Sequence, residues 1–153
     1  MTSISYEDIF SSFLGNVTDY NLTSLSVTDA YEIMTEYLHQ TVADPYVYHL
    51  FSTCKLDDET QTFSYTLSYP IEENMDNEFV ITALAKWMTY VWLHMQVKSV
   101  LNTVQAFMGK EQKYYSQAQH LSELRGLQDD AFKDARFFIQ NRTFINNNYL
   151  GGA

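Results

Sequence analysis

Residues 79–97 read FVITALAKWMTYVWLHMQV, and this stretch decides the fold. Its apolar residues recur at helical spacing, so we expect a helix from about residue 76 to residue 97. One side of that helix carries Ala83, Trp87, Tyr90 and His94, and another carries Val80, Leu84, Val91 and Met95. A helix with so little polar surface must be buried on nearly all sides. It therefore lies at the centre of a bundle or is completed by another subunit.

The same stretch is a poor membrane span, because Lys86 and several polar side chains interrupt it. The N-terminal sequence MTSISYEDIF has neither a basic flank nor an apolar run, so we expect no signal peptide. Cys54 is the only cysteine, which suits a reducing compartment. We therefore expect no membrane partner.

Two amphipathic helices are expected before the central one. The first covers residues 6–14, with Ser5 as its N-terminal cap. The second begins near Ser26 or Thr28 and carries apolar residues at helical spacing. It ends before Pro45, because the residue preceding a proline is disfavoured in the helical conformation.

Residues 46–76 form the irregular part of the chain. Within it Phe63, Tyr65, Leu67 and Tyr69 alternate with polar residues, which is typical of a half-buried strand. A single strand or hairpin is marginal on its own. A helix or a neighbouring subunit must therefore cover the aromatic face of this segment.

After the central helix we expect a short helix over residues 99–108 and a last helix over residues 116–142, which begins in a Ser-x-x-Gln capping box. An Asn- and Gly-rich tail, residues 143–153, follows with four apolar anchors: Phe144, Ile145, Tyr149 and Leu150. Such side chains are typical of docking residues, although packing back onto the parent domain explains them equally well.

These patterns predict a mainly α fold: a small helical bundle of four to five helices, with one irregular or short β-like insertion at about residues 46–76. Residues 1–142 form a single helical domain, and residues 143–153 form an extended C-terminal tail. The chain has 153 residues, of which 46% are hydrophobic and 16% aromatic. It is long enough to bury a core and too apolar for a disordered protein.

The net charge of −10 is unevenly distributed. Residues 1–85 hold 14 of the 19 acids and one base, Lys55, which gives −13. Residues 86–153 hold the other 5 acids and 8 bases, which gives +3. Because no Lys- and Arg-rich stripe is present to neutralise phosphates, ordinary nucleic-acid binding is disfavoured. Solubility is the simplest explanation of the acidity by itself.

No catalytic or cofactor-binding pattern is present. The four histidines (His39, His49, His94 and His120) lie at unrelated spacings, so each is more simply a packed or surface residue than a metal ligand. Nothing indicates an activated thiol at Cys54. A phosphate loop, a dinucleotide fingerprint and a Gly-x-Ser-x-Gly turn are all missing. We therefore expect a protein that is not an enzyme and uses no cofactor or metal.

One order of short motifs is distinctive. After Trp92-Leu93 come Tyr115-Ser116-Gln117-Ala118, His120-Leu121 and Leu124-Arg125, and a weaker match is Cys54-Lys55-Leu56 before an acidic loop. This order resembles the head–tail connector, or adaptor, proteins of tailed bacteriophages over about two thirds of the chain. The chain departs from that family in its aromatic segment 63–69 and in the low charge of its central helix.

The resemblance implies a structural virion protein in the neck between head and tail, assembled in the host cytoplasm. Its homo-oligomer ring of about twelve copies would bind beneath the portal protein. Such a ring extends the channel, lets double-stranded DNA pass without specific binding, and carries the next neck, stopper or tail protein. The alternative is a small helical protein that binds or regulates a partner, or a tail-completion or head-closure protein of the neck.

Three sets of residues follow from this interpretation. Portal docking is assigned to Phe144, Ile145, Tyr149 and Leu150. An acidic channel or rim, which would repel phosphate, is assigned to Asp57, Asp58, Glu59, Glu72, Glu73 and Asp76. Core or subunit packing is assigned to Val80, Leu84, Trp87, Val91, Met95, Leu121 and Leu124.

Overall fold

The computed structural model describes residues 1–17, 26–106 and 111–145, and the side chains of these residues outside 100–118 and 143–145. The protein is mostly helical (72%), and the described part contains five helices and a three-stranded sheet. The predicted class, a mainly α fold with a short β insertion, is confirmed. None of the described helices is both long and apolar enough to cross a membrane.

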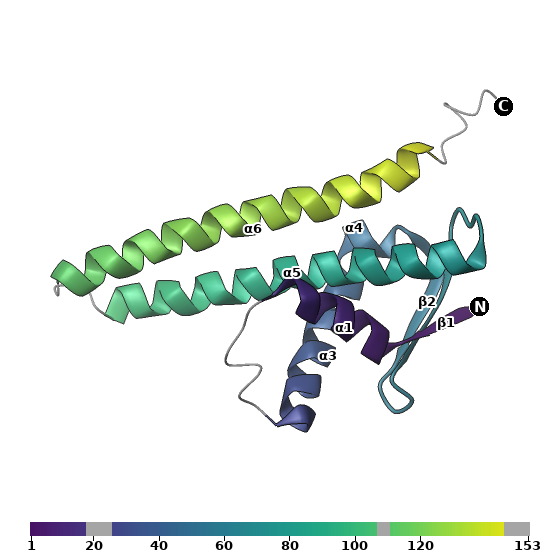
Figure 1. Ribbon diagram of the computed structural model, residues 1–153, viewed down its shortest axis with the longest axis horizontal. Helices are drawn as coiled ribbons and strands as arrows, with labels where there is room; N and C mark the ends of the chain where they lie inside the picture. Colours follow the sequence, from purple (N-terminus) through teal and green to yellow (C-terminus); the bar gives the residue numbers. More distant parts are fainter. Residues whose placement is uncertain (18–25, 107–110, 146–153) are drawn as a thin grey trace.

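Two long antiparallel helices, α5 (Glu73–Ala106) and α6 (Glu111–Ile145), form the backbone of the molecule (Figure 1). The sequence predicts three shorter elements here, and that prediction is wrong. α5 continues through residues 99–106 without a break, and α6 begins five residues before the predicted capping box. α6 also extends to Ile145, so the first three residues of the predicted tail are helical. Packing of each helix on the other supplies the stability that local signals do not reveal.

The two N-terminal helices begin at their predicted caps. Ser5 caps α1 (Tyr6–Asn16) and Ser26 caps α3 (Val27–Ala43), each by accepting the backbone N–H of the residue three positions later. Asp44 ends α3, as the following proline predicts. Its side chain then caps the short helix α4, which spans Pro45–Tyr48.

The insertion folds mainly as a β-hairpin of strands β2 (Phe51–Asp57) and β3 (Thr62–Leu67). Phe63 and Tyr65 on β3 are buried, as their alternation predicts, whereas Tyr69 lies beyond the strand and is exposed. The sequence pattern does not predict β1 (Thr2–Ser5), which pairs antiparallel with the other side of β3. The sheet order is therefore β1-β3-β2.

α5 is the central helix, in contact with α1, α3, α6 and β1. Trp87 is 2% exposed; its ring stacks on Tyr46 at 5.5 Å and meets Tyr90 and Phe132 edge-on at 5.8 Å. The other predicted packing residues Val80, Leu84, Val91, Leu121 and Leu124 are also buried. Met95 is not: it is 38% exposed.

Candidate functional site

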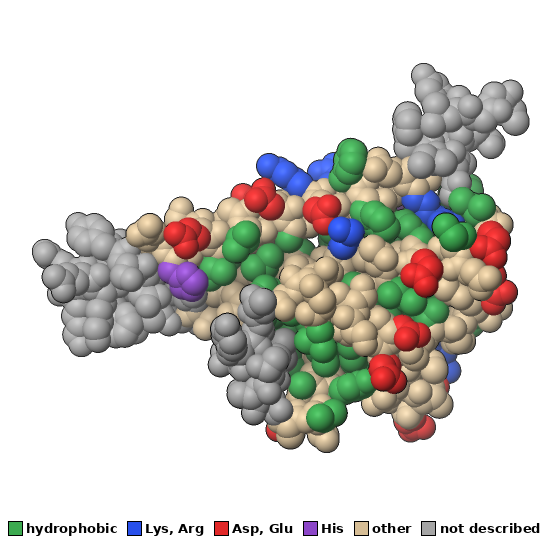
Figure 2. Space-filling model, in the orientation of Figure 1, with side chains coloured by type: hydrophobic (Ala, Val, Ile, Leu, Met, Phe, Trp, Pro, Cys, Tyr) green, Lys and Arg blue, Asp and Glu red, His purple; other side chains and the backbone are tan. Residues whose placement is uncertain are grey.

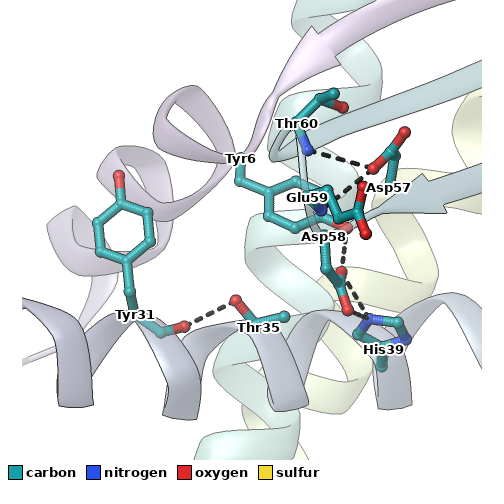
Figure 3. A network of polar contacts seen from close by, with 8 residues as sticks. All are labelled: Tyr6, Tyr31, Thr35, His39, Asp57, Asp58, Glu59 and Thr60. Carbon is teal, nitrogen blue, oxygen red and sulfur yellow. Dashed lines mark hydrogen bonds and ion pairs between the residues drawn. The ribbon is translucent and has the colours of Figure 1, made fainter.

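A polar network joins α1, α3 and the turn between β2 and β3 (Figure 3). The hydroxyl of Tyr6 donates to Oδ1 of Asp58 at 2.6 Å. The Nε2 atom of His39 lies 2.9 and 3.0 Å from the two oxygens of the same carboxylate. Tyr6 is fully buried, so this contact anchors the turn to the core.

The turn itself is shaped by its own backbone contacts. Oδ1 of Asp57 accepts the backbone N–H groups of Glu59 and Thr60 at 3.1 and 3.2 Å, an arrangement that Asp side chains often supply in turns. Gln61 has a φ of 53°, and its carbonyl accepts the backbone N–H of Tyr6 at 2.9 Å. The turn therefore holds Asp57, Asp58 and Glu59 in a defined place.

Hydrogen bonding fixes the charge state of this network. The bond from Tyr6, and then that from His39, lowers the pKa of Asp58. Burial, and then the bond to Asp58, raises the pKa of Tyr6 well above its usual value of 10. Tyr6 and His39 both contact the carboxylate rather than each other. The arrangement is thus a positioned negative charge and not a nucleophile paired with a base.

An open groove of about 670 Å³ lies beside the network, between α3 and the turn. The described residues that line it are Val27, Thr28, Tyr31, Glu32, Thr35, Asp58 and Gln61. We call it the acidic groove. It combines two carboxylates with an aromatic side chain, a combination that suits a Lys or Arg side chain. Among the described residues, no group of three or more His, Cys, Asp or Glu side chains could hold a metal ion.

A second polar cluster lies where the end of α6 meets the start of α5. Arg142 donates to Oδ1 of Asp76 at 2.7 Å and to the carbonyl of Tyr69 at 3.1 Å, and its guanidinium lies 4.4 Å from the centre of the Phe79 ring. The backbone N–H of Ile71 donates to the other Asp76 oxygen at 3.0 Å. Burial acts to raise the pKa of Asp76, but these hydrogen bonds outweigh it and hold the pKa below its usual value.

The predicted acidic set is divided by this arrangement. Asp57, Asp58 and Glu59 lie at the β2–β3 turn, whereas Glu72 and Glu73 lie at the start of α5, at the other end of β3. Asp76 is 5% exposed and paired with Arg142, so it does not belong to an acidic surface, and that part of the assignment is wrong. The sequence could not show this, because its partner lies 66 positions away.

Exposed apolar side chains surround the start of α5. Met1, Tyr69, Ile71 and Met75 are each more than 60% exposed. A small cleft of about 120 Å³ lies among them and is lined in part by Met1, Pro70 and Glu73. The sequence pattern places Tyr69 on the predicted half-buried strand. It predicts no role for Met1, Ile71 and Met75, because isolated apolar residues carry no periodicity.

The structure describes the backbone of two of the four predicted docking residues, and these two lie at the same end of the molecule. Phe144 and Ile145 belong to the last turn of α6, while Tyr149 and Leu150 lie outside the described residues. Arg142, three residues before the end of α6, ties this turn to the start of α5.

The part of the α5–α6 hairpin beyond α1 and α3 has its own small core. We call this part the distal arm. Leu93 and Val97 of α5 pack with Leu121 and Leu124 of α6, separate from the main core. The Nε2 atom of Gln128 lies 3.0 Å from Nδ1 of His94 and links the two helices. Three of the motif positions that carry the connector resemblance, Leu93, Leu121 and Leu124, are therefore packing residues of the arm.

Comparison of the chain with protein-family models, with curated proteins and with solved structures gave no match.

Proposed function

We propose that this protein is a ring subunit of the head–tail connector of a tailed bacteriophage, which binds beneath the portal and carries the next neck or tail protein. The distal arm is the observation that carries the proposal. Among the described residues its four buried side chains come from α5 and α6 only, and these two helices continue past α1 and α3 (Figure 1). A subunit of a ring completes such an arm against its neighbours.

The uncovered side of the arm supports this interpretation. Val80, Leu84 and Val91 face the main core, and Met95 continues their side of α5 one turn further. At that turn both Met95 and the adjacent His94 are exposed. Within the described residues, the apolar side of α5 thus extends past the part that the main core covers, and a neighbouring subunit would cover the remainder.

The end of the molecule around residues 69–75 supports a contact with the portal. Exposed apolar side chains gather there, beside the last turn of α6, which carries Phe144 and Ile145. Glu72 and Glu73 lie among them and are exposed. Exposed carboxylates at the rim of a channel would repel DNA phosphates and so allow the DNA to slide.

Electron microscopy of the purified protein, alone and with portal-bearing heads, tests the proposal. We expect class averages of a closed ring on the portal. A variant that lacks residues 146–153 should fold with the same helical circular dichroism but occupy few portals. A protein that remains monomeric under both conditions is not a connector, and the alternative of a helical regulatory protein would then be preferred.

A further inference from the structure

One side of α6 carries a group of exposed basic side chains. Arg125, Lys133 and Arg136 are exposed and lie within one sector of the helix. Within the described residues none of them forms an ion pair, and Arg136 contacts only the ring of Tyr46, at 5.7 Å. Asp129 lies one turn from both Arg125 and Lys133 and leaves the sector a net charge of +2. We call this sector the basic face.

The acidic groove has the opposite character. Glu32 and Asp58 line it from its two walls, and Glu36 and Glu59 are exposed beside it. In the described structure His39 is bound to Asp58, and Lys55 acts on the neighbouring Asp57 rather than on these four carboxylates. The floor includes Tyr31, whose aromatic ring can accept the stem and head of an Arg or Lys side chain.

The two surfaces lie on opposite sides of the molecule. α6 forms one edge, whereas α3 and the β2–β3 turn lie beyond α5 at the other edge (Figure 1). In the space-filling view most of the visible Lys and Arg side chains follow the α6 edge, where Asp and Glu side chains also lie, and the charged side chains in the lower part of the view are mainly Asp and Glu (Figure 2). One copy therefore cannot bring its own basic face to its own groove, but two copies can meet head to tail.

We infer that the basic face of α6 in one copy binds the acidic groove of the next copy, and that this contact closes the ring. The inference rests on the proposed function and names the surfaces that its ring uses. A contact between two different surfaces repeats from copy to copy, and it generates a ring when its rotation closes. In this arrangement the acids of the β2–β3 turn, Asp57, Asp58 and Glu59, lie at the contact with the neighbouring subunit. Of the predicted acidic set, Glu72 and Glu73 then remain as candidates for the channel.

Charge reversal on each surface tests the contact. The groove variant is Glu32→Lys with Glu36→Lys and Glu59→Lys, which changes the charge of the four groove carboxylates from −4 to +2. The face variant is Arg125→Glu with Lys133→Glu, which changes the charge of the basic face from +2 to −2. Self-association is measured by sedimentation equilibrium at about 0.15 M salt, where the Debye length of about 8 Å screens the long-range repulsion of the −10 subunits. We expect each variant alone to associate at least about tenfold more weakly than wild type.

A mixture of the two variants gives the decisive measurement. The groove variant then carries two basic surfaces and the face variant two acidic ones, so alternating copies are complementary again. We expect the equimolar mixture to associate within about threefold of wild type. No contact between the same surfaces of two copies would be restored in this way.

The control is Glu78→Lys with Glu123→Lys and Asp130→Lys, which changes the net charge as the groove variant does but on exposed residues elsewhere. If general repulsion limits assembly, control and groove variant will both associate more tightly than wild type, and the inference is wrong. It is also wrong if the mixture stays as weak as its components. Wild type that does not associate at all in solution contradicts the inferred contact. The proposed function is contradicted only if, in addition, no ring forms on portal-bearing heads.

Discussion

Removal of the Arg142 side chain from its buried pair should reveal how strongly the end of α6 is held. In Arg142→Met, Asp76 keeps the backbone N–H of Ile71 but loses its charged partner, while its side chain remains 7% exposed. Removing one partner of a buried ion pair typically costs about 3–5 kcal/mol, because the other charge is left uncompensated. The loss of the contact with Phe79 adds to this cost.

The penalty for the unpaired charge cannot exceed the free energy that protonates Asp76, because the carboxyl group can become neutral instead. This upper limit depends on pH. The carboxyl group has a pKa near 3.9 in an unfolded chain, so keeping it neutral at pH 7 costs about 4 kcal/mol. The limit falls by about 1.4 kcal/mol per pH unit and is about 1.5 kcal/mol at pH 5. Wild type behaves in the opposite way: the lowered pKa of Asp76 stabilises the fold above pH 4, and this contribution is lost as the pH falls below it.

Urea unfolding followed by circular dichroism at pH 5, 6 and 7 measures the difference. We expect Arg142→Met to lose about 3–4 kcal/mol at pH 7 and clearly less at pH 5. Adding Asp76→Asn to the variant should recover part of the loss at pH 7. Hydrogen exchange would show whether only the last turns of α6 detach, in which case the unfolding free energy changes less than the local protection does.

Lys86→Met provides the matched control. It breaks an ion pair of similar length, 2.6 Å to Asp134, between partners that are 27% and 62% exposed. We expect a loss of less than about 1 kcal/mol, with little dependence on pH. If Arg142→Met is no more costly than this control, or if its cost is the same at pH 5 and pH 7, burial of the Asp76 charge is not what stabilises this end of the molecule.

Three further outcomes are expected. Trp87→Ala should cost about 3–5 kcal/mol in a thermal or urea melt, since the ring is 2% exposed and packed among aromatic partners; an unchanged melt would contradict the described core. Tyr6→Phe should cost about 1 kcal/mol near neutral pH. The raised pKa of Tyr6 also predicts that wild type loses stability relative to Tyr6→Phe above pH 10, where the unfolded tyrosine ionises, and equal pH profiles would refute this. Glu72→Lys with Glu73→Lys should slow DNA ejection from assembled particles if these acids face the channel, whereas normal ejection would mean that they serve only solubility. Because Glu72 accepts backbone N–H groups at the α5 N-terminus, a melt should check that the variant keeps its stability.

Local signals predicted the parts of the fold that local contacts determine. The caps Ser5 and Ser26 act within three residues, and the alternation of Phe63 and Tyr65 follows from one strand facing the core. β1 has only four residues, and pairing with a strand about sixty positions later stabilises it. No local sequence pattern therefore predicts this strand. Likewise, the polar residues around Ser99 predict the end of a helix. α5 continues past them because it packs against α6, a contact that the local sequence does not reveal.

The candidate site was less predictable, because it depends on pairs that are distant in sequence. The acids were recognised as a group, but their division between the turn and the start of α5 follows from the hairpin that separates them. Tyr6 and His39 meet Asp58 only after α1 and α3 have packed on α5. The sequence does not reveal the basic face of α6, because its charges are spread over about three turns of a helix that holds as many acids as bases.

The long side chains on the basic face also bear on how many copies a ring would contain. About twelve copies require a rotation of about 30° between neighbours, and thirteen require only about 2° less. Lys and Arg side chains reorient through several bonds and keep an ion pair over such a small change, whereas a tightly interlocked apolar contact does not. Free protein should therefore form rings of mixed size, and the portal, as a template of fixed symmetry, would select one of them.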